Sequence, residues 1–320
     1  MPNIITHGLF AKKVYNDITN KPLQNIIRQN PREFIIGSNG PDFFFFYKFF
    51  QKEYAHIRNI GSIVHATKIN DFYQNAFECI EKEINIDIKN AMISYLAGHL
   101  CHWALDSRAH PYVNYHTGAY TGISESWHHR FESMMDAMLL KKIKNESIQT
   151  FKFYLLTKQS KNTIKAISNI YIPVLKKVYE IDLSEQQIKD ALNDWYRIQT
   201  YLYDPTGTKT KILKLYEKKV NRPWLYSGNV VPYKIDERFD VLNESKKEWC
   251  YPTDNTKKSN ESFMEIFKRA QKIGIECLNH FNDLEFILAK LNNESYDTGE
   301  SINKELKYFD YIYGGEHENI

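Results

Sequence analysis

Helical periodicity is the feature that most constrains the fold of this chain. Apolar residues recur every three or four positions through most of the 320 residues, as they do on the buried face of an amphipathic helix. No segment alternates convincingly between apolar and polar residues, as a half-buried strand does. The sequence therefore predicts an all-α fold, a multihelical single domain over residues 1–320 with eight to ten helices.

Several helices can be placed from their capping and breaking residues. The first is expected to begin at Thr6, others to span 62–84 and 88–109, with Pro111 ending the latter, and another to begin near Ser126. Ser184 and Gln187 form a capping-box pattern, and 258–291 reads as one further helix. By contrast, the stretch 203–257 contains four prolines and predicts irregular loops with at most a short hairpin.

Charge, cysteines and the amino-terminal sequence exclude several classes of protein. The net charge of +3 is too small to indicate a stable nucleic-acid partner. Four scattered cysteines without a CxxC pair argue against a disulfide framework and against a thiolate zinc site. The first residues show no basic start followed by an apolar run, so no secretory signal is expected and the predicted location is cytoplasmic.

The histidines are concentrated in the first 130 residues. Nine of the eleven precede residue 130, and six fall within 99–129, interleaved with acidic residues. A single histidine is usually an ordinary core or surface residue, but a cluster of this kind needs another explanation. We therefore predict that the chemistry of the chain lies in a core within residues 1–140.

Two pairs in this cluster have the spacing of neighbours on a helix. His102 and Asp106 are four residues apart, on the same stripe as Met92 and Tyr95, which should enter the core. His128 and Glu132 repeat the spacing on a second helix. A buried carboxylate without a partner is costly, and a divalent metal removes that cost because imidazole and carboxylate are both zinc ligands. The pattern predicts a metal site.

The same residues carry a resemblance to a known family. The run Gly-His-Leu-Cys-His-Trp-Ala-Leu-Asp-Ser-Arg-Ala-His-Pro at 98–111, followed by Trp-His-His-Arg-Phe-Glu at 127–132, resembles the core signature of the zinc-dependent phospholipase C family. Thr-His at 6–7, Gly-Pro-Asp at 40–42 and Gly-Ser-Ile-Val-His at 61–65 are similar to the remaining ligand segments, in the same order. Single-strand-specific fungal nucleases share this fold and metal arrangement.

The resemblance implies a set of metal ligands and a cofactor of two or three zinc ions. One zinc would be held by Asp42, His65, His102 and Asp106, and a second by His110, His128 and Glu132. Asp106 would also reach a third zinc, together with His7. We expect this third site to be weak, because secreted members place a processed amino-terminal Trp on it, whereas this chain begins Met-Pro.

The activity implied is metal-dependent hydrolysis of phosphodiester bonds, as in a phospholipase C, with Asp42 as a candidate catalytic base. The expected partner is a small phosphate ester or a phospholipid head group, in transient contact with a membrane surface. Two alternatives stay open: a nuclease or phosphomonoesterase on the same trinuclear core, and a non-catalytic protein that metal stabilises. Head group, leaving group and oligomeric state are not determined by the sequence.

Other residues of the amino-terminal half have less specific roles. The aromatic run 43–50 predicts a buried helix more strongly than a hydrophobic lip for acyl chains. His99 is equally compatible with a partner of the metal ligands and with a core hydrogen bond. His129 is expected to face solvent, and Asp136 to support the site or lie on a helix surface.

Overall fold

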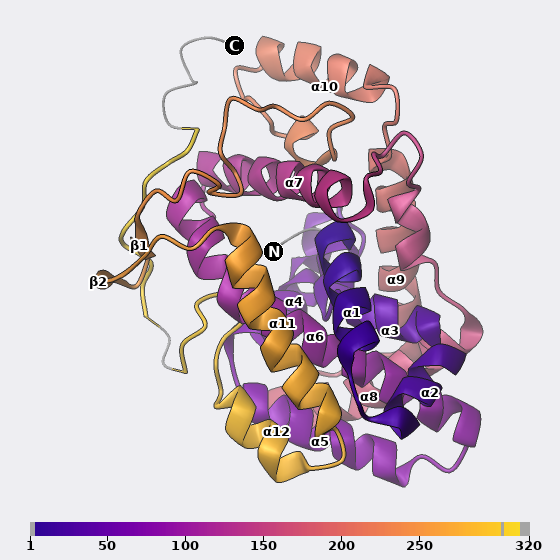
Figure 1. The fold of residues 1–320 in the computed structure, drawn as a ribbon. Coiled ribbons are helices and arrows are strands. Elements are labelled where there is room, and N and C mark those ends of the chain that lie inside the picture. Colours follow the sequence, from indigo (N-terminus) through magenta and orange to yellow (C-terminus); the bar gives the residue numbers. More distant parts are fainter. Residues whose placement is uncertain (1–3, 302–303, 314–320) are drawn as a thin grey trace.

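The computed structural model describes residues 4–301 and 304–313, and it is all-α, as predicted (Figure 1). The described residues form twelve α-helices, four short 3-10 helices (η1–η4) and one two-stranded antiparallel sheet. The helices are α1 (Ile4–Asp17), α2 (Lys21–Gln29), α3 (Pro31–Gly37), α4 (Ala55–Ala66), α5 (Ile69–Lys82), α6 (Ile86–Thr117), α7 (Ile123–Lys144), α8 (Lys161–Tyr179), α9 (Glu185–Leu202), α10 (Thr208–Lys219), α11 (Phe263–Asn279) and α12 (Leu284–Leu291). The 3-10 helices are η1 (Asp42–Phe46), η2 (Lys52–Tyr54), η3 (Phe153–Thr157) and η4 (Ser227–Asn229), and the strands are β1 (Trp249–Tyr251) and β2 (Asp254–Ser259).

The number of helices exceeds the eight to ten predicted, partly because two expected helices are each broken in two. The segment 62–84 divides between α4 and α5 at Lys68, which adopts a left-handed conformation with φ 53°. The segment 258–291 divides between α11 and α12, where Asp283 accepts a hydrogen bond from the backbone N–H of Phe286 and caps the new helix. Apolar periodicity continues across such breaks, so it does not reveal them.

Helix α6 is the central element of the fold. Its 32 residues pass between α3, α8 and α11, and nearly all side chains from Ala91 to Asn114 are buried. A helix that is buried on all sides belongs to the core. The prediction that Pro111 ends this helix is wrong, because the helix continues to Thr117. Proline in a helix costs roughly 3 kcal/mol, and the packing around α6 offsets that cost.

A close crossing of α3 and α6 sets the position of the segment that follows α3. A Cβ atom on Gly37 would lie 2.1 Å from the Tyr95 carbonyl oxygen, and one on Gly98 would lie 2.1 Å from the Phe34 carbonyl oxygen. Only glycine allows the two backbones to approach this closely. The turn after α3 therefore lies against α6, which brings Asp42 close to the histidines of that helix.

The prediction of irregular loops over 203–257 is wrong in part. Residues 208–219 form α10, which Gly207 precedes in a left-handed conformation with φ 74°. The predicted short hairpin is present as β1 and β2, and it extends to Ser259. None of the described helices is long and apolar enough to cross a membrane. That residues 1–320 form one domain stays a prediction.

Candidate metal centre

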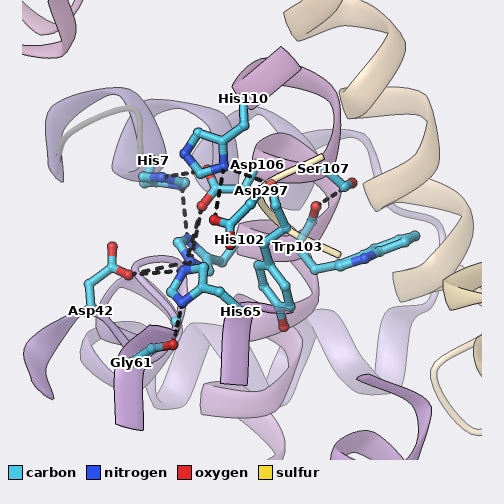
Figure 2. A network of polar contacts seen from close by, with 12 residues as sticks. His7, Asp42, Gly61, His65, His102, Trp103, Asp106, Ser107, His110 and Asp297 are labelled. Atoms are coloured by element: carbon cyan, nitrogen blue, oxygen red, sulfur yellow. Dashed lines mark hydrogen bonds and ion pairs between the residues drawn. The ribbon is translucent and has the colours of Figure 1, made fainter. Parts of the chain in front are cut away.

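All eight predicted metal ligands lie at one place in the fold, although they come from five different elements. Figure 2 shows six of them converging between the ribbons. Three groups have ligand atoms that all lie within 4.8 Å of one another, and the residues in every group are buried. The groups are His7, His102 and Asp106; Asp42, His65 and His102; and His110, His128 and Glu132. The structure therefore brings together the residues that the sequence predicts to hold metal.

The first group is the most deeply buried. His7 from α1 places its Nε2 atom 3.1 Å from Oδ1 of Asp106, and its Nδ1 atom 3.4 Å from Nδ1 of His102. His102 Nε2 lies 3.2 Å from the other carboxylate oxygen of Asp106, one turn along α6. All three side chains have 0% of their surface exposed. We call His7, His102 and Asp106 the deep group.

A second group shares His102 with the deep group. The Nε2 atoms of His65 and His102 are 3.2 Å apart, and Oδ1 of Asp42 lies 3.3 Å from the first and 3.7 Å from the second. His65 comes from the last turn of α4 and Asp42 from the first residue of η1. Gly40 makes this approach possible, because a Cβ atom there would lie 2.1 Å from Cδ2 of His102.

The third group, which we call the outer group, consists of His110, His128 and Glu132. On α7, His128 Nε2 is 2.9 Å from Oε1 of Glu132, the side chain one turn further on. His110 comes from α6, and its ring centroid lies 6.1 Å from that of His128. These three residues line a cleft, whereas the residues of the deep group are fully buried and do not line it.

Three of the histidines are oriented through their Nδ1 atoms. His65 Nδ1 lies 2.7 Å from the Gly61 carbonyl oxygen, one turn earlier in α4. The Nδ1 atoms of His110 and His128 lie 2.7 Å from the carbonyl oxygen of residue 296 and 3.2 Å from the Thr117 hydroxyl. A hydrogen bond at Nδ1 directs Nε2 at the centre of each group, which is how metal-bound histidines are usually held.

Burial and neighbouring charges shift the pKa values of several candidate ligands, in different directions. Burial raises the pKa of Asp42 to about 6. Burial also disfavours ionisation of Asp106 and Glu132, but neighbouring histidines outweigh it: His7 and others lower the pKa of Asp106, and His128 helps to lower that of Glu132 to about 2. For His65, burial lowers the pKa, yet the hydrogen bond and charge of Asp42 raise it to about 9.

Unsatisfied atoms show that the donor set fits a metal. Both carboxylate oxygens of Asp106, Oδ1 of Asp42 and Nε2 of His7 are buried and make no hydrogen bond within the described part of the chain. Leaving such groups without a hydrogen bond costs on the order of 1–3 kcal/mol each, more when they are charged. Imidazole nitrogens and carboxylate oxygens are zinc ligands, and zinc bound among them would satisfy these atoms.

Asp136 positions the helix that carries His7. Its carboxylate accepts hydrogen bonds from the backbone N–H groups of Ile5 and Thr6, at 3.1 and 2.8 Å, and from the Thr6 hydroxyl at 2.6 Å. It therefore caps α1 from across the core, and burial raises its pKa to about 7. The prediction that Thr6 begins the helix is wrong, because α1 starts earlier and the Thr6 side chain is bound to Asp136. The expected role of Met1 and Pro2 at the third metal lies outside the described residues.

One part of the site, the segment 292–300 after the last helix, is not predicted from the sequence. The backbone N–H of Tyr296 donates to the His65 carbonyl oxygen at 3.0 Å, and its ring packs on His65 and His102, with centroids 4.9 and 5.4 Å away. The next residue, Asp297, has a carboxylate oxygen 3.9 Å from Nδ1 of His110, and burial raises its pKa. This segment has no helical periodicity and lies about 160 residues beyond the ligand motifs, so no local signal identifies it.

The remaining candidates have mixed outcomes. His99 lies in a cage of tyrosine hydroxyls, with Nδ1 2.8 Å from Tyr73 and Nε2 3.1 Å from Tyr171, and belongs to no ligand group. His129 was expected to face solvent, but it is half-buried and 3.0 Å from the Tyr120 hydroxyl. The aromatic run is not the buried helix predicted: its first residues are buried in η1, whereas Phe49 and Phe50 are exposed.

The cleft above the site has a volume of about 620 Å³. Asp42, His65 and the outer group form its floor, and α9 contributes Trp195 and Gln199 to one side. Phe45, Phe46 and Phe49 form an apolar wall. The cleft therefore gives a ligand access to five of the eight candidate metal ligands.

The family model described as zinc-dependent phospholipase C matches residues 6–180, more than half of the chain. The chain belongs to this family. The match begins beside His7 and includes every candidate ligand, and membership indicates metal-dependent hydrolysis of phosphodiesters. No curated protein and no solved structure matches the chain.

Proposed function

We propose that this member of the zinc-dependent phospholipase C family is a zinc-dependent phosphodiesterase that cleaves phospholipids at the head-group phosphate. The observation that carries the proposal is the cleft, which has an apolar wall beside a floor of candidate metal ligands. The proposed ligands are the deep group, Asp42, His65 and the outer group, and they provide for two or three zinc ions. The cytoplasmic location stays a prediction.

The charge of the cleft supports a metal-dependent reaction. Its described lining includes four carboxylates, those of Asp42, Glu125, Glu132 and Asp297. The same lining contains one basic residue other than histidine, Arg58. The Arg58 guanidinium donates to the backbone carbonyl oxygens of residues 47, 48 and 51. An anionic phosphate would be repelled from such a cleft unless bound cations reversed its field.

Bound zinc supplies Lewis acidity toward the phosphate oxygens and lowers the pKa of water. The chain contributes the orientation of the ligands and a proton acceptor. We assign the latter role to Asp42, whose Oδ1 atom makes no hydrogen bond within the described residues and which lines the floor of the cleft. Because His65 and His102 lie within 4 Å of this oxygen, its basicity depends on their protonation.

The wall of the cleft favours a lipid over a nucleic acid. Phe45, Phe46 and Phe49 line one side, and Leu202 and Leu306 also face the cavity. Such side chains can bind the acyl part of a substrate. Binding a nucleic-acid strand requires cationic groups along its backbone, and the described lining has only Arg58, which is bound to the loop that it supports.

A substrate panel with zinc-loaded protein tests the proposal. Short-chain phosphatidylcholine should yield diacylglycerol and phosphocholine, and bis-p-nitrophenyl phosphate should be cleaved more slowly. Single-stranded DNA and p-nitrophenyl phosphate should be poor substrates. Preferential cleavage of DNA would indicate a nuclease instead, and preferential cleavage of the monoester would indicate a phosphomonoesterase. Absence of all four activities would favour a non-catalytic, metal-stabilised protein.

A matched pair of variants tests the role of Asp42. Asp42→Asn keeps the shape of the side chain but removes its basicity, so kcat should fall roughly a hundredfold or more, in the range that general base catalysis contributes. Asp182→Asn removes an exposed carboxylate and should retain wild-type activity. Zinc content measured on the same samples separates loss of the base from loss of metal.

A further inference from the structure

Helix α10 exposes an unusually apolar face for the surface of a protein. Ile212 is 63% exposed, Leu215 71% and Tyr216 50%, and Val220 just after the helix is 37% exposed. The first three are related by steps of three and four residues, so they share one face of the helix. Glu217 is the only side chain of α10 that is fully buried. Figure 1 shows α10 at the periphery of the molecule, beyond α7.

Lysines border this apolar face. The helix contains five lysines and a single acidic residue. Lys211 and Lys218 lie on the stripe next to Ile212 and Leu215, and Lys219 follows Leu215 by one turn. All three lysines are exposed, and none of them makes an ion pair with a carboxylate within the described residues. An apolar stripe bordered by basic residues is the arrangement of helices that lie in the interface of a membrane.

Hydrogen bonds to the inner side of α10 attach it to neighbouring segments of the fold. The Glu217 carboxylate accepts hydrogen bonds from the backbone N–H groups of Tyr226 and Ser227, both at 2.7 Å. At the other end Asp204 accepts from the backbone and hydroxyl of Thr210, both at 2.8 Å. The sole acid of the helix is thus turned inward, where its carboxylate accepts hydrogen bonds, and this leaves the outer face basic and apolar.

The helix is also connected to the rim of the cleft. Leu202, the last residue of α9, lines the cleft, and so does Asn229 at the end of η4. The chain leaves the rim after Leu202, forms α10 and returns to the rim at Asn229. Both segments that flank α10 therefore reach the opening of the cleft, and they connect this opening to any surface that binds α10.

We propose that α10 docks the protein on an anionic phospholipid surface, with Ile212, Leu215 and Tyr216 inserted and the lysines facing lipid phosphates. Charge complementarity favours an anionic lipid surface over a second copy of the chain as the partner of α10. In an isologous contact, a second copy would place one lysine-rich face against another, which like-charge repulsion disfavours. The proposal concerns binding alone, so it can be tested independently of the proposed catalytic activity.

Vesicle sedimentation with the full chain tests the proposal. The protein should bind vesicles of phosphatidylcholine with 30% phosphatidylserine much more tightly than vesicles of phosphatidylcholine alone, and high salt should weaken the binding. Replacing three lysines, in Lys211→Gln/Lys218→Gln/Lys219→Gln, should weaken it by about a hundredfold, because each basic residue near an anionic surface contributes a factor of roughly five. Ile212→Ser/Leu215→Ser should weaken binding to both vesicle types by at least about tenfold.

Matched controls separate this face from the rest of the surface. Lys12→Gln/Lys268→Gln/Lys272→Gln makes the same change in net charge, and Ile84→Ser/Ile86→Ser removes two exposed isoleucines where α6 begins. Both controls should bind like the wild type. All four variants should hydrolyse a soluble substrate at the wild-type rate.

Three results would overturn the proposal. The first is that the wild type does not bind anionic vesicles, and the second is that the α10 variants bind as tightly as the wild type. The third is a concentration-dependent dimer in analytical ultracentrifugation that Ile212→Ser/Leu215→Ser abolishes without affecting vesicle binding, which would make a second copy the occupant. Failure of hydrolysis with intact vesicle binding would contradict the proposed function and leave the docking surface in place.

Discussion

The deep group and the outer group use the same kinds of side chain in different surroundings. His7, His102 and Asp106 are fully buried and do not line the cleft, whereas His110, His128 and Glu132 line it. The deep group also shares His102 with Asp42 and His65, so two of the three clusters depend on one imidazole. The outer group shares no residue with the others. Metal bound by the deep group should therefore support its neighbours through the shared His102, while the outer position is the more accessible to substrate.

Exchange of one carboxylate in each group is the sharpest way to test this difference. Asp106→Asn removes the anionic charge that faces both His7 and His102, so we expect the metal content to fall by more than one ion per chain. Activity should fall roughly a thousandfold or more, since a catalytic metal stabilises the transition state by several kcal/mol. Glu132→Gln should lower the content by one ion and leave the deep metal in place. Elemental analysis and kcat/KM measure both effects.

The comparison fails if the two variants behave alike. Loss of a single ion in each would mean that the deep position does not support its neighbours. Full metal content in Asp106→Asn would show that its carboxylate is not a ligand. Circular dichroism of both proteins must retain the helical spectrum of the wild type, so that a folding defect is not mistaken for loss of a ligand.

A smaller effect is expected from the residue that orients His128. The Thr117 hydroxyl donates to the Val113 carbonyl oxygen at 2.8 Å and lies 3.2 Å from Nδ1 of His128, which leaves its oxygen free to accept the Nδ1 proton. Thr117→Val keeps the shape and removes the acceptor. Partners of this kind typically change metal affinity by 10–100-fold, so the outer metal should be lost at correspondingly lower chelator concentration.

The control for this variant is Thr67→Val, because Thr67 makes a similar bond to a helix carbonyl in an exposed position. It should titrate with chelator as the wild type does. An unchanged titration curve for Thr117→Val would show that the threonine does not orient the ligand. A shift in release of all the metal ions, instead of the outer one, would contradict the independence of the two groups.

The two groups also differ in how far the sequence predicted them. The pairs His102 with Asp106 and His128 with Glu132 are local, because helix geometry places residues four apart side by side. His7 and Asp42 join them only through long-range packing, and here the resemblance to a known family supplied what spacing does not. Tyr296 and Asp297 were missed because neither the periodicity nor the motifs extend to the segment that contains them.

The errors in the fold have a common physical origin. Pro111 was expected to end its helix on local grounds, and burial of α6 on all sides overrides that preference. The break at Lys68 is a single left-handed residue between two helices with continuous apolar periodicity. The prolines on both sides of α10 predict a loop there, and only one side chain of the helix is fully buried. Local patterns predict helices that bury one face in the core and miss a helix such as α10, most of whose side chains are exposed.

His99 completes the comparison, because it is as deeply buried as the deep group but has no carboxylate beside it. Burial, with a smaller contribution from the charge of His65, lowers its pKa to about 3. In the unfolded chain a histidine has a pKa near 6.5, so below that pH the unfolded state binds a proton that the folded state excludes. The contribution of His99 to the free energy of unfolding is therefore fully present above pH 6.5 and is lost as the pH falls toward 3, by about 2 kcal/mol between pH 7 and pH 5.

In His99→Gln this loss should be absent, so urea titrations should show the stability of the variant falling about 2 kcal/mol less than that of the wild type over the same interval. His56→Gln, at an exposed position, controls for removal of an imidazole. The histidines of the metal centre contribute equally to both proteins, so parallel pH profiles for wild type and His99→Gln would mean that the tyrosine cage admits the protonated ring.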